Sequence, residues 1–187
     1  MRRAAPVRAG GIRQRAPDTI TLVDANSLLA FVRFHAWAND RILATAAGLS
    51  DEELHRPAVL DRGSAFETLR HLVDVDWSWR ELCIGHDVGE TYVWDHGFAL
   101  GDLPGIHAFC LDEDARLRGY VESLDDAALD ERVGTDSTWP RWLILAHVVN
   151  HGTQHRSEIA HYLTRCGHSP GDLDLLDAFD LPWPGGG

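Results

Sequence analysis

The stretch "HVVNHGTQHRSEIAHYL", residues 147–163, predicts a helix that carries histidines at regular spacing. His147, His151 and His155 are each four residues apart, and residues four apart on an α-helix lie nearly one above the other. Two neighbouring imidazoles on such a face can chelate one metal ion, as the histidines of an HExxH helix do. Spacing alone leaves the pairs His147/His151 and His151/His155 equally suitable, and a solvated face that is merely rich in histidine fits the same pattern.

Three more helical segments precede this one. Helices are predicted at about 24–47, 65–84, 104–122 and 140–166, with apolar residues at helical spacing in the first three. Ser50 with Glu53, and Ser64 with Glu67, have the spacing of a capping box at a helix N-terminus. The first of these boxes predicts a short extra turn at 49–54. Four amphipathic helices in one chain predict an all-α fold, a four-helix bundle.

The connections between these helices are of two kinds. Residues 86–103, between the second and third long helices, have no clean periodicity. A connection of this length permits a crossover, so a simple up-down-up-down order is not assured. Residues 123–138 are expected to be mostly turn and loop.

Composition excludes several classes of protein. The chain has 187 residues and a formal net charge of -12, and all 17 of its basic residues are arginine. A body this acidic is a poor match for a phosphate backbone, so we expect no nucleic-acid partner. No apolar run approaches the length of a membrane span, so we expect no membrane partner. The cysteines, Cys83, Cys110 and Cys166, are odd in number and far apart, which favours a reducing cytoplasm.

Two segments are distinguished by charge and composition. Residues 1–18 hold five arginines before the first acidic residue, Asp18, together with Pro and Gly. They lack the apolar region of a signal peptide. Their composition predicts a disordered basic N-terminal arm, with a misassigned start as the alternative. Residues 19–187 are predicted to form one domain, a length sufficient to bury a real core.

A metal site needs more than the two histidines of a chelating pair. A catalytic zinc site takes three protein ligands and keeps an open position, so a third ligand must come from another helix. His71, in the apolar stretch "LRHLVDVDWSW", is the best candidate, with His35, His86 and His96 as rivals. A lone histidine in such a setting is more often a core residue with a hydrogen-bond partner.

Some polar and aromatic residues lie close to these histidines in sequence. Asp74, Asp76 and Glu158 could each orient an imidazole N–H or act as a base, although a solvated surface is the more common position for a carboxylate. Trp77 and Trp79 could line an apolar pocket, or simply fill the bundle core.

Three stretches together resemble the DinB-like family of the DinB/YfiT superfamily, over roughly residues 25–175. The first is "FVRFHAWANDRILATAAGLSDEEL", which is similar to the opening helix of the family and its "LSxEEL" turn. The second is "SAFETLRHLVDVDWSW", and the third is "HVVNHGTQHRSEIAHYLTRCGHSPGDLDLL", similar to the family's "HxxNHxxxHRGQ". All three occur in the family's order and spacing.

The resemblance implies a DinB/YfiT-like bundle, commonly a homodimer, in which His71, His151 and His155 bind one divalent metal ion, zinc or nickel. Many members of the family also have a histidine at the position of His147, and in the family that histidine does not bind the metal ion. The chain departs from "HRGQ" in having Ser157 and Glu158, and the glutamate adds a negative charge near the site.

Characterised relatives of this kind include thiol-dependent S-transferases and a maleylpyruvate isomerase. The resemblance therefore implies a metal-dependent enzyme of the thiol S-transferase type, with a low-molecular-weight thiol as co-substrate. Asp76 or Glu158 would move the proton, and Trp77 and Arg156 would line the pocket or surround the ligands. The alternatives are a metal-dependent hydrolase or isomerase, and a non-catalytic metal- or ligand-binding stress-response protein.

Overall fold

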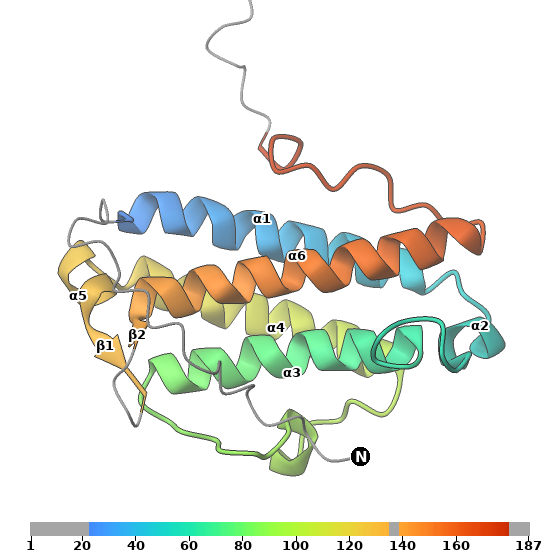
Figure 1. Ribbon diagram of the computed structural model, residues 1–187, viewed down its shortest axis with the longest axis horizontal. Helices are drawn as coiled ribbons and strands as arrows, with labels where there is room; N and C mark the ends of the chain where they lie inside the picture. Colours follow the sequence, from blue (N-terminus) through green and yellow to red (C-terminus); the bar gives the residue numbers. More distant parts are fainter. Residues whose placement is uncertain (1–22, 135–138, 180–187) are drawn as a thin grey trace, which may run out of the picture.

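The computed structural model describes residues 23–134 and 139–179. The predicted N-terminal arm, residues 1–18, lies outside the described residues, as do residues 19–22, 135–138 and 180–187 of the predicted domain. In the described ranges the chain is mostly helical (Figure 1). The all-α fold is therefore confirmed.

Four long helices form the body of the described structure. They are α1 (Ala25–Ala46), α3 (Ala65–Cys83), α4 (Leu103–Glu122) and α6 (Arg141–Arg165). Each lies within two residues of its predicted bounds. Gly85 and Gly167 follow the ends of α3 and α6 with φ angles of 93° and 88°, a left-handed conformation in which glycine ends a helix without strain.

The four helices pack as a bundle in which α1 and α3 each contact both α4 and α6. In Figure 1, α1 and α6 run in one direction, and α3 and α4 run in the other. The order is therefore up-down-down-up. The long connection between α3 and α4 makes this possible, because it returns the chain to the end of the bundle at which α3 began. It contains one 3-10 turn, η1 (Val93–His96).

The helix starts agree with the predicted capping. Ser50 and Glu53 form the predicted capping box at the start of α2 (Asp51–His55). At α3, Ser64 accepts a hydrogen bond from the Glu67 backbone N–H, as predicted. The Glu67 carboxylate, however, accepts a hydrogen bond from Arg70 (2.8 Å). It does not accept one from the Ser64 backbone N–H, so the second hydrogen bond of the predicted capping box is not formed.

Of the predicted loop 123–138, the described part, residues 123–134, contains more structure than the expected turns, and residues 135–138 lie outside the described residues. Asp125 caps a five-residue helix, α5 (Asp126–Asp130). It leads into an antiparallel pair of two-residue strands, β1 (Arg132–Val133) and β2 (Trp139–Pro140). Elements this short have no periodicity to detect, and packing stabilises them. The α5 helix contacts α6, and Asp126 accepts a hydrogen bond from the backbone N–H of Ala25.

The core consists of two apolar clusters separated by a polar layer. One cluster lies toward α2 and includes Ile42, Leu69 and Ile159, and the other lies toward α5 and includes Val32, Leu117 and Leu145. Between them, polar side chains from all four long helices are buried: His35, Asn39, Asp76, Arg80, Glu113, Asp114 and Arg156. Asp74 is also fully buried and accepts a hydrogen bond from the Val93 backbone N–H (2.8 Å). The expectation that these carboxylates lie at the solvated surface is therefore wrong for Asp74 and Asp76.

Candidate metal centre

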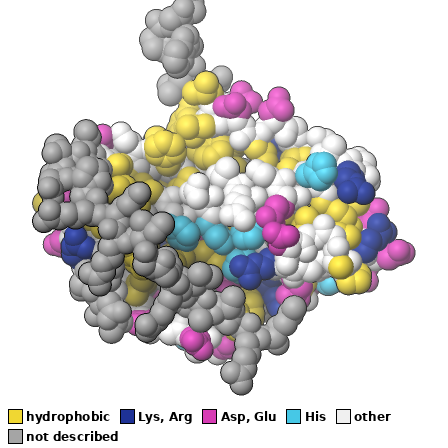
Figure 2. Space-filling model, viewed as in Figure 1, with side chains coloured by type: hydrophobic (Ala, Val, Ile, Leu, Met, Phe, Trp, Pro, Cys, Tyr) yellow, Lys and Arg dark blue, Asp and Glu magenta, His cyan; other side chains and the backbone are white. Residues whose placement is uncertain are grey.

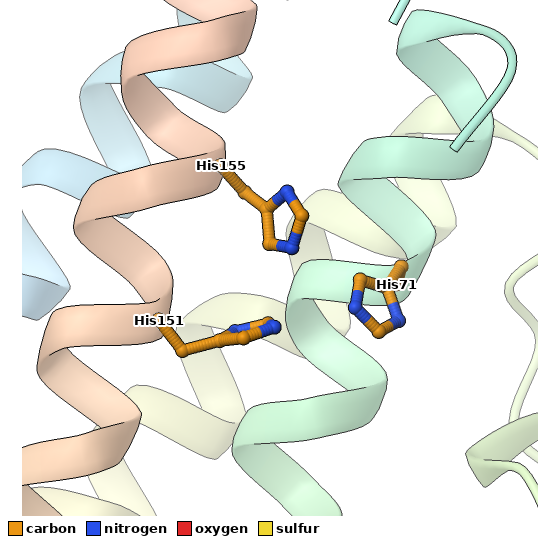
Figure 3. A group of neighbouring side chains, drawn as sticks. All are labelled: His71, His151 and His155. Carbon is orange, nitrogen blue, oxygen red and sulfur yellow. The ribbon is translucent and has the colours of Figure 1, made fainter. Parts of the chain in front are cut away.

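The antiparallel packing of α3 on α6 brings three histidines together. His151 and His155 lie one turn apart on α6, and His71 faces both from α3 (Figure 3). The ring centroid of His71 is 5.1 Å from that of His151 and 5.0 Å from that of His155, and the two α6 rings are 4.5 Å apart. Each side chain offers a nitrogen within 4.8 Å of the other two. One ion can therefore be reached by all three.

The cluster is buried on one side and accessible on the other. His155 is 3% exposed, whereas His71 and His151 are half-buried. Figure 2 shows histidine side chains at the surface of the face where α3 and α6 lie next to each other. A small molecule can therefore approach the cluster from this face.

The surroundings of His151 suit a metal ligand. Its Nδ1 is buried and has no hydrogen-bond partner within the described residues. Burial lowers the pKa of His151 to about 3, and the neighbouring His155 and His147 contribute in the same direction. The imidazole is therefore neutral at physiological pH, which is the form that binds divalent transition metals.

The orientation of His155 is fixed by a carboxylate. Glu158, three residues further along α6, places Oε2 3.1 Å from His155 Nδ1. An ionised carboxylate can only accept a hydrogen bond, so the proton of the imidazole lies on Nδ1. The lone pair of Nε2 then points toward the space between the three rings (Figure 3). Metal-binding histidines characteristically donate their second ring N–H to a partner, and a carboxylate is one of the common ones.

The histidine stripe on α6 extends beyond the cluster, to His147. This ring is 5.9 Å from that of His151 and 5.4 Å from that of Trp79 on α3. Burial lowers the pKa of His147. The group of three nitrogens does not include it. The packing of α3 thus favours the pair His151/His155 over His147/His151, a choice that spacing leaves open.

A second group of potential ligands, His35, Asp76 and Asp114, lies in the buried polar layer. His35 Nε2 is 2.9 Å from Asp76 Oδ2. Asn39 donates from Nδ2 to the same oxygen (3.3 Å) and to Asp114 Oδ1 (3.2 Å). From α6, Arg156 donates to Asn39 Oδ1 (2.7 Å) and lies 3.0 Å from His35 Nδ1. These contacts link α1, α3, α4 and α6.

The tautomer of His35 makes this second group unsuitable for a metal ion. Arginine has only donors, so His35 Nδ1 accepts from Arg156, and the imidazole proton lies on Nε2. That N–H donates to Asp76, and no lone pair remains for a cation. The Arg156 guanidinium also supplies positive charge to the group. Burial nevertheless raises the pKa of Asp114 to about 6 and lowers that of Arg156 to about 10. Because both ring nitrogens of His35 are engaged in hydrogen bonds, we assign the group a structural role.

The remaining predicted site residues lie in other surroundings. Asp76 and Arg156, both 2% exposed, belong to this buried network. Trp77 is 4% exposed and packs on His96 and Phe98 of the long connection. Trp79, by contrast, contacts His147 next to the three-histidine cluster. The catalytic and pocket roles of Asp76, Glu158, Trp77 and Arg156 stay predictions. Of the rival ligands, His86 pairs with Glu81, and His96 contacts Thr91.

Sequence reasoning missed Gly152, which lies on α6 between His151 and His155. A Cβ there would lie 2.5 Å from His35 Cε1 and from Arg156 Nη1, so only glycine allows this approach. A glycine in a helix interior costs about 1 kcal/mol relative to alanine, and its presence usually has a packing reason. The presence of a glycine inside a predicted helix is therefore the one feature of the sequence that points to a close contact at this position.

The fold and the histidine cluster define a class, the four-helix bundles with a candidate metal site between two antiparallel helices. A sequence model described as the DinB family matches residues 24–183. The chain therefore belongs to the DinB family, and the resemblance drawn from its motifs is confirmed. No curated protein matches the chain significantly. Within the described residues, no helix is both long and apolar enough to cross a membrane.

Proposed function

We propose that this protein binds one divalent metal ion, zinc or nickel, through His71, His151 and His155, and that it is a metal-dependent enzyme of the thiol S-transferase type. The observation that carries the proposal is the meeting of three imidazole nitrogens within 4.8 Å on a partly exposed face. Three protein ligands leave at least one coordination position for a small molecule, as in catalytic zinc sites.

When bound, the ion supplies a coordination position that stabilises a thiolate over a thiol. His71 and His151 are half-buried, so a low-molecular-weight thiol could approach an ion held by the three histidines from their exposed side. The transferase reaction would join the thiolate sulfur to an electrophilic carbon, the leaving group would depart with its electron pair, and Asp76 or Glu158 would move the thiol proton to solvent. Trp79 and His147, in ring contact beside the cluster, offer an aromatic surface for the electrophile.

The alternative functions use the same three histidines. A metal-dependent hydrolase or isomerase would need the ion without consuming a thiol. A non-catalytic metal-binding stress-response protein would need the ion without turnover. The homodimer and the cytoplasmic location stay predictions.

The test is a screen of low-molecular-weight thiols against chlorodinitrobenzene, a generic aromatic electrophile, with untagged protein loaded with zinc or nickel. We expect conjugation that depends on both the metal and one class of thiol, and its loss in His71→Ala. His161→Ala is the matched control, because His161 is exposed on the same helix, α6, as two of the three histidines. Metal binding without thiol-dependent conjugation by any thiol would contradict the transferase proposal and leave the other two functions.

A further inference from the structure

The Glu158 carboxylate makes a contact that links it to the cluster. Within the described residues, its only side-chain hydrogen bond is the one to His155 Nδ1, at 3.1 Å. The Glu158 side chain is 24% exposed and that of His155 is 4% exposed, so the contact lies at the edge of the buried side of the cluster. The arginines of the described residues form their ion pairs with other carboxylates.

The contact is directed at one ligand of the cluster. His151 Nδ1 has no hydrogen-bond partner within residues 23–134 and 139–179. A carboxylate on one imidazole therefore acts on the centre in two separate ways: it holds that ring in place, and it adds one negative charge near a site otherwise built from neutral ligands.

We infer that Glu158 is a positioning residue of the metal centre, which raises its affinity for a divalent cation and at the same time lowers the affinity of the loaded centre for anions. The inference rests on the proposed metal binding by His71, His151 and His155.

The two effects have opposite signs for a simple electrostatic reason. A carboxylate hydrogen-bonded to an imidazole makes the ring a stronger ligand, and removal of such a partner typically lowers metal affinity about 10- to 100-fold. The same negative charge repels an anion that approaches the open coordination position. Its removal therefore leaves a more electrophilic centre. Damage to the local structure would weaken the binding of both the cation and the anion. Opposite changes in the two affinities therefore distinguish an electrostatic effect of Glu158 from a structural one.

Two variants separate the charge of Glu158 from its hydrogen bond. Glu158→Gln keeps an oxygen that can accept from His155 Nδ1 and loses only the charge, whereas Glu158→Ala loses both. Glu67→Gln is the matched control, because Glu67 lies one turn before His71 on α3 but bonds to Arg70. It removes an equal charge near a ligand without touching an imidazole.

The measurements use the full chain. Cobalt(II) affinity is determined by competition with a chromophoric chelator, azide affinity by titration of the cobalt spectrum of the loaded protein, and the melting temperature of the metal-free protein checks the fold. We expect Glu158→Gln to weaken cobalt binding about tenfold, Glu158→Ala to weaken it further, and Glu67→Gln to leave it within about twofold. Azide should bind the loaded Glu158→Gln protein several-fold more tightly than the wild type.

Three outcomes would count against the inference. Wild-type cobalt affinity in Glu158→Gln and Glu158→Ala would overturn it while leaving the proposed metal site intact. Weaker binding of both cobalt and azide, with a lowered melting temperature, would assign Glu158 a structural role instead. Absence of cobalt binding by the wild type would contradict the proposed function itself, and this inference with it.

Discussion

Gly152 lies directly against His35: a Cβ at position 152 would come within 2.5 Å of His35 Cε1. The contact joins the two polar features of the bundle, because Gly152 stands between two residues of the metal cluster and His35 lies in the buried network. The buried network thus fixes how closely α6 approaches α1, and with it the position from which His151 and His155 reach toward α3.

Gly152→Ala should therefore destabilise the protein. Alanine normally favours a helix by about 1 kcal/mol over glycine, but overpacking here should cost about 1–3 kcal/mol beyond that gain. Urea unfolding measures the difference. Gly119→Ala on α4 is the control, because a Cβ at that position meets nothing within 4 Å. It should stabilise the protein by up to about 1 kcal/mol. Equal stabilisation by both substitutions would contradict the close approach.

Arg156→Met should cost about 3–5 kcal/mol, because it removes the cation from a buried group that includes Asp76 and Asp114. The free energy of unfolding, or the melting temperature if the variant is marginal, measures this loss. Arg165→Met, at the exposed end of α6, should change stability by less than about 0.5 kcal/mol. A loss below about 1 kcal/mol for Arg156→Met would contradict the structural role assigned to the buried network.

Asp114→Asn should change how stability depends on pH. Burial raises the pKa of Asp114 from 3.8 to about 6 in the folded protein. The folded state then holds this proton more tightly than the unfolded chain, so the favourable contribution is present at low pH and is lost as pH rises through about 6. A shift of this size corresponds to about 3 kcal/mol. The asparagine variant lacks this loss.

The check is the difference in unfolding free energy between Asp114→Asn and the wild type at pH 4 and pH 7. The difference should move in favour of the variant as pH rises. Glu113, whose pKa burial raises to about 7, and His151, whose pKa is lowered to about 3, also titrate, but they are common to both proteins. A difference that does not change with pH would contradict the burial of an ionisable Asp114.

His147→Ala should leave the affinity for a divalent ion within about threefold of the wild type, because His147 lies outside the group of three nitrogens. His155→Ala should lower it by more than about a hundredfold, as expected for loss of a direct ligand. Isothermal titration with zinc compares the two. A loss of similar size in both variants would restore the pair His147/His151 that spacing alone permits.

The sequence predicts the four helices well, because the first three have apolar residues at helical spacing, the fourth has histidines at helical spacing, and glycines follow the ends of the second and the fourth. It does not predict α5, β1 and β2, whose few residues are stabilised by contacts with α1 and α6. The sequence also does not predict the direction in which α4 runs, because the long connection between α3 and α4 is compatible with either direction. Packing in the bundle decides it.

The site is predictable to a similar degree. The four-residue spacing marks a chelating stripe, but the choice of His155 over His147 depends on where α3 crosses α6. The buried network escapes prediction for a different reason. Asp76, Asp114 and Arg156 are far apart in sequence and are each of a type usually found at the surface. Only the bundle brings them together, and only their mutual hydrogen bonds make their burial tolerable.

The most direct test of the central claim is the metal content of untagged protein, measured by mass spectrometry after exposure to zinc and removal of free ions. We expect one divalent ion per chain in the wild type and in His161→Ala, and far less than one in each of His71→Ala, His151→Ala and His155→Ala. A wild-type chain without bound metal, or full occupancy in His71→Ala, would contradict a metal centre shared by α3 and α6.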